Sequence, residues 1–162
     1  MKKIWITGAS SGIGRALSLK FAKEGWLVAS SARREKLLQE ISKIDNNITP
    51  FPLDVTNSEK CKEVFAQIKK KFNDIDVVLF CAGIHDPELE KDFNLENIQK
   101  IMNVNFFGVI NSINSVYDYF KEKKNGHISI ISSVAGYRGL PSSGAYCSSK
   151  SAITTFAESL YF

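Results

Sequence analysis

Residues 7–14 read Thr7-Gly8-Ala9-Ser10-Ser11-Gly12-Ile13-Gly14 and lie between the first apolar run of the chain and its first amphipathic stretch. The three glycines permit a tight turn, backbone approach to a ligand without a Cβ, and close packing of a helix whose N-terminus attracts negative charge. A dinucleotide diphosphate needs all of these features. We therefore predict a cofactor-binding loop that comprises Gly8, Ser10, Ser11, Gly12, Ile13 and Gly14. The alternative is a glycine-rich turn that only connects a strand to a helix.

Short apolar runs alternate with longer amphipathic stretches along the whole chain. The near-continuous apolar character of these runs is typical of strands in a parallel sheet that is covered on both faces. We assign five such strands, at Ile4–Thr7, Trp26–Ser31, Ile48–Leu53, Val77–Cys81 and Ile128–Ser132. The alternation predicts an α/β fold with a doubly wound parallel sheet and strand order 3-2-1-4-5.

The amphipathic stretches show the spacing of helices that bury one face. From Glu59 onward the lysines face outward, and the predicted inward positions are Cys61, Val64, Phe65, Ile68 and Phe72. Thr56 and Glu59 are interpreted as a capping box at the start of this helix. Gly25 marks the end of the first helix, and the longest predicted helix spans about Leu95–Lys123.

The composition excludes several kinds of protein. Apolar residues make up 44% of the 162 residues and charged residues 23%, as in a globular domain, and the net charge of +4 is dispersed. Because this charge forms no stripe, we expect no nucleic-acid partner. The N-terminal apolar run is too short for a signal peptide, and no run approaches the ~20 residues that span a membrane. The three cysteines lack metal-ligand spacing, so we expect a cytoplasmic protein without membrane contact or a metal site.

The spacing Tyr-x-x-x-Lys occurs three times, at Tyr117–Lys121, Tyr119–Lys123 and Tyr146–Lys150. Residues four apart share one face of a helix, and an ammonium beside a phenol favours the phenolate that can act as a base. Only Tyr146 follows the fifth predicted strand, at the sheet edge where ligands bind. We therefore select Tyr146 and Lys150, and we interpret the other two pairs as solvated surface residues.

The TGxxxGxG spacing of the loop and the Tyr146–Lys150 pair resemble the short-chain dehydrogenase/reductase family, and the resemblance covers all 162 residues. It implies a single Rossmann-like NADP(H)-binding and catalytic domain over residues 1–162, which is the N-terminal two-thirds of a family member. It also implies an oxidoreductase that transfers a hydride between NADP(H) and a small-molecule carbonyl or alcohol. The catalytic residues that the resemblance implies are Asn105, Ser133, Tyr146 and Lys150.

Each of these roles has a structural alternative. Ser133, rather than Ser132, matches the family serine that binds the substrate oxygen, but both serines could instead cap or bond a strand end. In the family, the backbone carbonyl of the residue matched by Asn105 holds a water that relays protons to the lysine. The alternative is an asparagine bonded to a neighbouring element, since asparagine is unfavourable inside an apolar helix.

The second predicted strand ends in Ser30-Ser31-Ala32-Arg33-Arg34, without the carboxylate that accepts the ribose hydroxyls in NAD-binding folds. Arginine offers paired donors to a phosphate. We therefore expect NADP(H) rather than NAD(H), with Arg33 as the preferred contact of the 2′-phosphate. The alternative is that both arginines are solvated at the start of the next helix.

The resemblance implies further cofactor contacts at other strand ends. Asp54 and Val55 lie beside the adenine in the family, although an aspartate here could equally bond its own turn. The family lysine that Lys150 matches also holds the nicotinamide ribose. Cys81 stands where the family has asparagine, and we interpret it as a small core residue. The positions at which the backbone passes close to the cofactor are Ala82 and Gly83.

The motifs specify neither substrate nor direction. An alternative function is an NADP(H)-binding regulator or scaffold without turnover, although an intact set of Ser133, Tyr146 and Lys150 argues against it. The segment Ser143–Phe162 is still helical in pattern where the sequence stops. We therefore expect a chain that is truncated before its last strands, and a homodimer or homotetramer for the complete protein.

Overall fold

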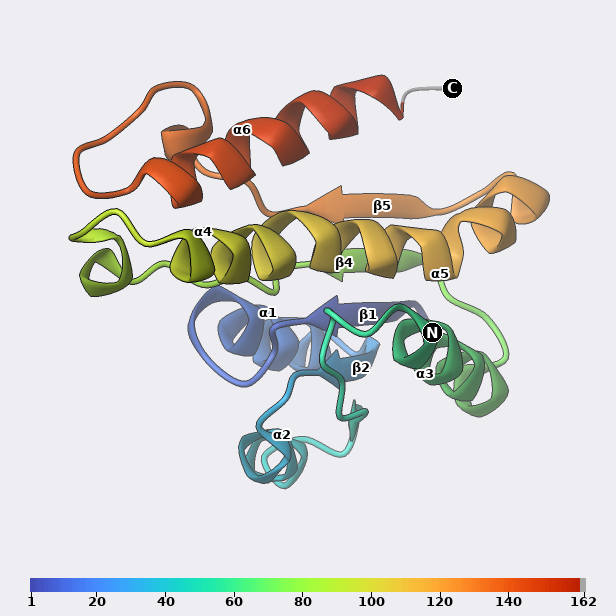
Figure 1. Ribbon diagram of the computed structural model, residues 1–162. Coiled ribbons are helices and arrows are strands. Elements are labelled where there is room, and N and C mark those ends of the chain that lie inside the picture. Colours follow the sequence, from blue (N-terminus) through green and yellow to red (C-terminus); the bar gives the residue numbers. More distant parts are fainter. Residues whose placement is uncertain (161–162) are drawn as a thin grey trace.

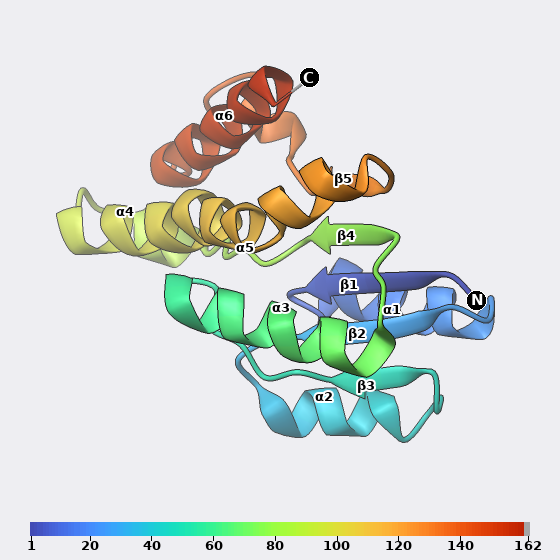
Figure 2. The same cartoon turned by 90° about the vertical axis from the view of Figure 1, so that its right-hand side faces the viewer.

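Five parallel strands form the centre of the computed structural model, which describes residues 1–160. Their order is β3-β2-β1-β4-β5, and Figure 2 shows them stacked in this sequence. The bounds are Lys3–Thr7 for β1, Leu27–Ser31 for β2, Ile48–Pro50 for β3, Val77–Phe80 for β4 and His127–Ile130 for β5. The predicted α/β fold, the doubly wound parallel sheet and the strand order are confirmed.

Helices connect the strands and cover both faces of the sheet. They are α1 (Gly12–Lys23), α2 (Glu35–Ser42), α3 (Ser58–Phe72), α4 (Leu95–Met102), α5 (Gly108–Lys123) and α6 (Gly144–Ser159). In Figure 1, α4 and α5 cross in front of β4, and α6 runs along the outer side of β5. Within residues 1–160, no helix is both long and apolar enough to cross a membrane.

Two apolar cores lie on opposite faces of the sheet. Side chains alternate along β1, so Ile4 and Ile6 pack with residues of α1 and α2, whereas Trp5 packs with residues of α3 and α5. Trp5 is fully buried, and its indole Nε1 donates a hydrogen bond of 2.9 Å to Ser31 Oγ. Both faces of this central strand are therefore dry, which explains why its sequence is apolar without interruption.

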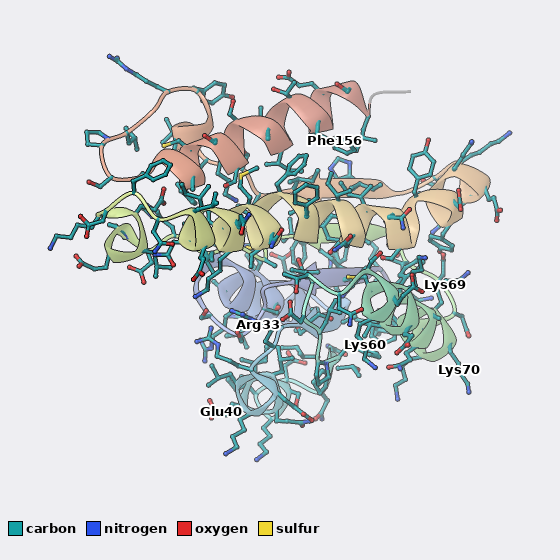
Figure 3. All side chains as sticks on the ribbon, viewed as in Figure 1. Arg33, Glu40, Lys60, Lys69, Lys70 and Phe156 are labelled. Carbon is teal, nitrogen blue, oxygen red and sulfur yellow. The ribbon has the colours of Figure 1, made fainter. Side chains whose placement is uncertain are left out.

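The start of α3 differs from the prediction, although its buried face does not. The residues predicted to face inward are all buried, and Figure 3 shows Lys60, Lys69 and Lys70 projecting from the outside of the helix. The capping box of Thr56 and Glu59 is wrong. Asn57 is the N-cap, because the helix begins at Ser58, and its side-chain Oδ1 accepts from Lys60 N; the Thr56 hydroxyl lies before the helix and donates to Asp54.

Two other helices also depart from the predicted pattern. The predicted helix Leu95–Lys123 contains a π-helical turn at Asn103–Phe107, which separates α4 from α5. The predicted helical segment Ser143–Phe162 is helical only over Gly144–Ser159, and its last two residues lie outside the described residues. Short 3₁₀ turns at Pro87–Glu90 and Val134–Gly136 were not predicted.

The interpretation of Tyr119 and Lys123 as solvated is wrong. Both are partly buried at the end of α5, where the Tyr119 hydroxyl donates to Asp74 Oδ1 and Lys123 Nζ lies 2.7 Å from the same oxygen. Lys123 also donates to Ile75 O at 2.7 Å. These contacts tie α5 to the segment before β4, at the end of the sheet opposite the glycine loop, so this Tyr–Lys pair is structural.

Candidate active site

A cleft of about 700 Å³ opens at the carboxyl ends of the strands. This is the edge at which parallel α/β sheets bind their ligands, because the strand order reverses direction between β1 and β4. Every predicted cofactor contact lines this one cleft: Gly8, Ser10, Ser11, Gly12, Ile13, Gly14, Arg33, Asp54, Val55, Ala82, Gly83, Tyr146 and Lys150. Of the four predicted catalytic residues, Ser133 lines it as well, and Asn105 lies behind it.

The three glycines of the loop meet three different surroundings. Gly8 has a φ of +70° and packs against Ala82, where an added Cβ would lie 2.8 Å from the backbone. At Gly14 an added Cβ would lie 2.4 Å from the carbonyl oxygen of Gly8. Gly12, with a φ of +53°, faces open space, since a Cβ there would meet nothing within 4 Å. Gly8 and Gly14 therefore close the turn, and Gly12 leaves the start of α1 accessible to a ligand.

Arg34, the neighbour of the preferred Arg33, contacts the glycine loop directly. Its guanidinium donates to Ser10 Oγ at 2.9 and 3.2 Å and to Ser11 Oγ at 2.6 Å. Both arginines are exposed and line the cleft, and Figure 3 labels Arg33 there. Two guanidinium groups and two hydroxyls thus surround the open end of the loop, which is the donor chemistry that a phosphate requires.

The remaining strand ends supply the walls of the cleft. Asp54 bonds its own turn, as the structural alternative for this residue predicted: its Oδ1 accepts from the N and Oγ1 of Thr56. Its exposed side chain also lines the cleft. Cys81 is half-buried and lines the cleft too, so it is not the core residue that we predicted. Burial raises the pKa of its thiol, and the charge of Lys150 opposes this shift.

Tyr146 and Lys150 stand on one face of α6, in its first two turns. Lys150 is 6% exposed, its Nζ donates to Ile131 O at 2.8 Å, and it lies 5.9 Å from the centre of the Tyr146 ring. Burial lowers the pKa of this ammonium, because the charged form loses solvation. The geometry therefore brings a phenol and a buried cation together inside the cleft.

The two serines after β5 have separate tasks. Ser132 Oγ donates to Lys150 O at 3.2 Å and lies 2.6 Å from Thr154 Oγ1, so it anchors α6. Ser133 caps the turn Val134–Gly136 by accepting from Ala135 N at 3.1 Å, and it is only half-buried. Both line the cleft. Since Ser132 is committed to the helix, Ser133 is the hydroxyl that a ligand can share.

Asn105 is fully buried in the π-helical turn. Its Oδ1 accepts from Ile84 N at 2.7 Å, and its Nδ2 donates to Ile84 O at 2.8 Å and to Ser149 Oγ at 3.1 Å. The side chain therefore joins the segment after β4 to α6, which is the structural alternative named for it. Such π-turns are rare in helices and occur often at functional sites.

Two further residues beside Tyr146 had no assigned role in the sequence analysis. His85 lines the cleft, and its ring stacks on the Tyr146 ring with centroids 4.1 Å apart. Glu90 accepts from the backbone N of Ala145 and of Tyr146. The position of His85, two residues after Gly83 at a strand end, was a usable signal. Glu90 had none, because a contact across 55 residues of sequence leaves no local pattern.

Comparisons with known proteins agree with this architecture. The model of the short chain dehydrogenase family matches residues 2–162. The 3-oxoacyl-(acyl-carrier-protein) reductase of Thermotoga maritima is 36% identical over 91% of this chain and 62% of its own length. The NADP-dependent 3-hydroxy acid dehydrogenase of Schizosaccharomyces pombe is 32% identical over 98% of this chain and 64% of its own.

Solved structures show the same fold. A short-chain dehydrogenase from Streptomyces avermitilis superposes with a TM-score of 0.89 at 26% identity, covering 98% of this chain and 59% of its own. ElxO with NADP bound superposes with a TM-score of 0.88 at 30% identity, and the match covers 96% of this chain and 64% of the ElxO chain. The chain thus spans less than two-thirds of each of these four proteins. With a family match over nearly all of its residues, the chain belongs to the short-chain dehydrogenase family, as its motifs indicated.

Proposed function

We propose that this protein transfers a hydride between NADP(H) and a small-molecule carbonyl or alcohol, with Tyr146 as the general acid and base. The observation that carries the proposal is the shared cleft: Tyr146 and the buried Lys150 line the same cavity as the glycine loop. A dinucleotide held by that loop therefore reaches the only Tyr–Lys pair of residues 1–160 that lines the cleft.

The chain's residues fit the dinucleotide, which supplies the hydride when bound. The open start of α1 at Gly12 suits the diphosphate, and Asp54 and Val55 suit the adenine end. Arg33 and Arg34 suit a 2′-phosphate, because β2 ends without a carboxylate and both guanidiniums line the cleft. The NADP-dependent dehydrogenase among the relatives and the NADP bound to ElxO support the choice of NADP(H) over NAD(H).

The proton chemistry is assigned to three side chains. Tyr146 donates its proton to the carbonyl oxygen during reduction and removes the proton of the alcohol during oxidation. The Ser133 hydroxyl binds the same oxygen and holds it beside Tyr146. Lys150 stabilises the phenolate form of Tyr146 through its charge, and its ammonium holds the nicotinamide ribose.

Asn105 is assigned a supporting role in this proposal. Its side chain already bonds Ile84 and Ser149, so we assign its backbone carbonyl to the water of a proton relay to Lys150. The bond to Ser149 holds the π-turn against α6, the helix that carries Lys150.

A screen of NADPH oxidation with a panel of ketones and aldehydes tests the function. Turnover of at least one carbonyl, abolished by Tyr146→Phe while NADPH binding is kept, supports it. Binding of NADPH without turnover of any compound in either direction would instead support the regulator or scaffold. The homodimer or homotetramer of the complete protein stays a prediction. Light scattering of that protein at micromolar concentration tests it, and a monomer would contradict it.

A further inference from the structure

Helix α6, which carries Tyr146, has no N-terminal cap of its own. Its N-cap residue is Ser143, whose side chain makes no capping hydrogen bond, and its first turn has no acidic residue. The Ser143 hydroxyl lies 3.4 Å from His85 Nε2 instead. The first backbone N–H groups of a helix have no partner within the helix and require one from outside.

That partner comes from the segment after β4. Glu90, the last residue of the turn Pro87–Glu90, places its Oε2 2.6 Å from Ala145 N and 3.2 Å from Tyr146 N. One carboxylate oxygen thus serves both N–H groups, and the negative charge lies at the positive end of the helix dipole. The cap of α6 is supplied from 55 residues away in the sequence.

Within residues 1–160, the other oxygen of Glu90 makes no hydrogen bond that competes with the two bonds to α6. Glu90 Oε1 is buried and has no hydrogen-bond partner among residues 1–160. A buried carboxylate oxygen without a partner is unfavourable. The two bonds from α6 to Oε2 are therefore the interactions that offset the desolvation of this carboxylate.

We propose that Glu90 is a positioning residue that fixes the backbone of Tyr146 and so sets where its phenol lies in the cleft. The inference rests on the proposed function, since it gives Glu90 a role in catalysis only if Tyr146 is the acid and base. The segment that carries Glu90 is itself anchored to Asn105 by the two Ile84 bonds. Glu90 thus connects the π-turn at Asn105 to the backbone of Tyr146, so the two are held at a set separation.

The test compares Glu90→Ala, Glu90→Gln and Glu88→Gln in the full chain. Glu88 is an exposed glutamate of the same turn and is the matched control. In Glu90→Ala, amide hydrogen exchange at Ala145 and Tyr146 accelerates at least tenfold, while the amides of α1 keep their rates. Turnover (kcat) falls about tenfold to hundredfold, as for a misplaced catalytic group, and the Kd for NADPH stays within about twofold.

The conservative variants separate positioning from general stability. Glu90→Gln keeps an oxygen acceptor at the same reach. It therefore retains most of the exchange protection at Ala145 and Tyr146 and most of kcat, both of which Glu90→Ala loses. Glu88→Gln behaves as the unmodified protein. Unchanged exchange at Ala145 and Tyr146 in Glu90→Ala would overturn the proposal. So would a loss of kcat that merely follows loss of NADPH binding or of folded protein.

Failure of the proposed function gives a different pattern. If the unmodified protein turns over no carbonyl or alcohol, the function falls, and with it the catalytic consequence of the Glu90 cap. The exchange rates would then still decide whether Glu90 holds the Tyr146 backbone. If Glu90→Ala does not fold, Glu90→Asp is measured in its place: its shorter side chain cannot serve both N–H groups, so partial loss of protection and kcat is expected, and full retention of both overturns the proposal.

Discussion

The His85 imidazole lies against the Tyr146 phenol, with ring centroids 4.1 Å apart and ring planes inclined by 28°. Both rings line the cleft, so His85 covers one face of the proposed acid and base. Stacked aromatic pairs contribute about 0.5–1.5 kcal/mol beyond their buried area. His85 comes from the loop after β4 and Tyr146 from α6, so the stack joins these two walls of the cleft.

Replacing His85 tests what this stack contributes. We expect His85→Ala to lower kcat/KM about two- to tenfold, the equivalent of one lost aromatic pair, with NADPH affinity nearly unchanged. His85→Phe keeps a ring on the phenol and should retain most of the activity. Steady-state kinetics with a responsive carbonyl measures both. Equal losses in the two variants would mean that the imidazole nitrogens, rather than the stack, matter.

Tyr146 and Tyr119, which share the Tyr-x-x-x-Lys spacing, should respond differently to loss of the hydroxyl. Tyr146→Phe removes the proposed proton donor and should lower kcat about 10²- to 10⁴-fold without loss of NADPH binding. Tyr119→Phe should leave kcat near normal and cost about 1 kcal/mol of unfolding free energy, because its hydroxyl bonds Asp74 and accepts from Ile75 N. Kinetics and urea unfolding distinguish them, and an inactive Tyr119→Phe would refute the choice of Tyr146.

The cofactor preference should depend on both arginines. A hydrogen-bonded phosphate contact contributes about 1.5–3 kcal/mol, so Arg33→Ala and Arg34→Ala should each weaken NADPH binding about ten- to hundredfold and leave NADH binding much less affected. Arg34→Ala also frees Ser10 and Ser11 and should disturb the loop more. Fluorescence titration with both dinucleotides measures this. Equal affinities of the unmodified protein for NADPH and NADH would contradict the NADP(H) assignment.

Alanine at Gly14 should lower the stability of the fold, whereas alanine at Gly12 should mainly lower cofactor affinity. A methyl group at Gly14 would lie 2.4 Å from Gly8 O, so Gly14→Ala should lower stability by about 1–3 kcal/mol through overpacking. A methyl group at Gly12 meets open space, and the φ of +53° costs only about 1–2 kcal/mol. Gly12→Ala should therefore fold. It should lose cofactor affinity, because the methyl group would occupy the open start of α1 that is proposed to hold the diphosphate. Thermal melting and NADPH titration of both variants provide the comparison.

Asp74 should make stability depend on pH at the acid end. The Lys123 hydrogen bond, followed by that of Tyr119, lowers the pKa of Asp74 to about 2. A carboxyl whose folded pKa lies below its unfolded value of about 3.9 stabilises the fold above that value, and the contribution is lost as pH falls through about 2. The Asp74 side chain is 45% exposed, so solvent screens its interaction with Lys123. We therefore expect the carboxylate to contribute about 1 kcal/mol to the free energy of unfolding.

The measurement is the unfolding free energy of Asp74→Asn between pH 2 and pH 7. The variant should be less stable than the unmodified protein at pH 7 and equally stable near pH 2. Asp118→Asn, an exposed position on α5, is the control and should show little difference at any pH. A penalty for Asp74→Asn that persists unchanged at pH 2 would show that the carboxylate charge is not responsible.

The local pattern of the chain was enough to predict the fold and the edge of the sheet at which the cleft opens. Parallel strands that are covered on both faces must be apolar along their length, and helices must present one apolar face, so both periods are written in the sequence. The carboxyl ends of such strands meet at one edge. Gly8 and Tyr146 were therefore predicted to share a site from their places after strands, whereas Asp54 was implied by the family resemblance.

Contacts between distant segments were decided only in the tertiary structure. The burial of Tyr119 beside Asp74 and the placement of Arg34 on Ser10 depend on how the elements pack in three dimensions. The Glu90 cap of α6 is the extreme case, since neither its helix nor its turn carries any sign of the other. A hydrogen bond across 55 residues depends on how the elements pack, and no period in the sequence records it.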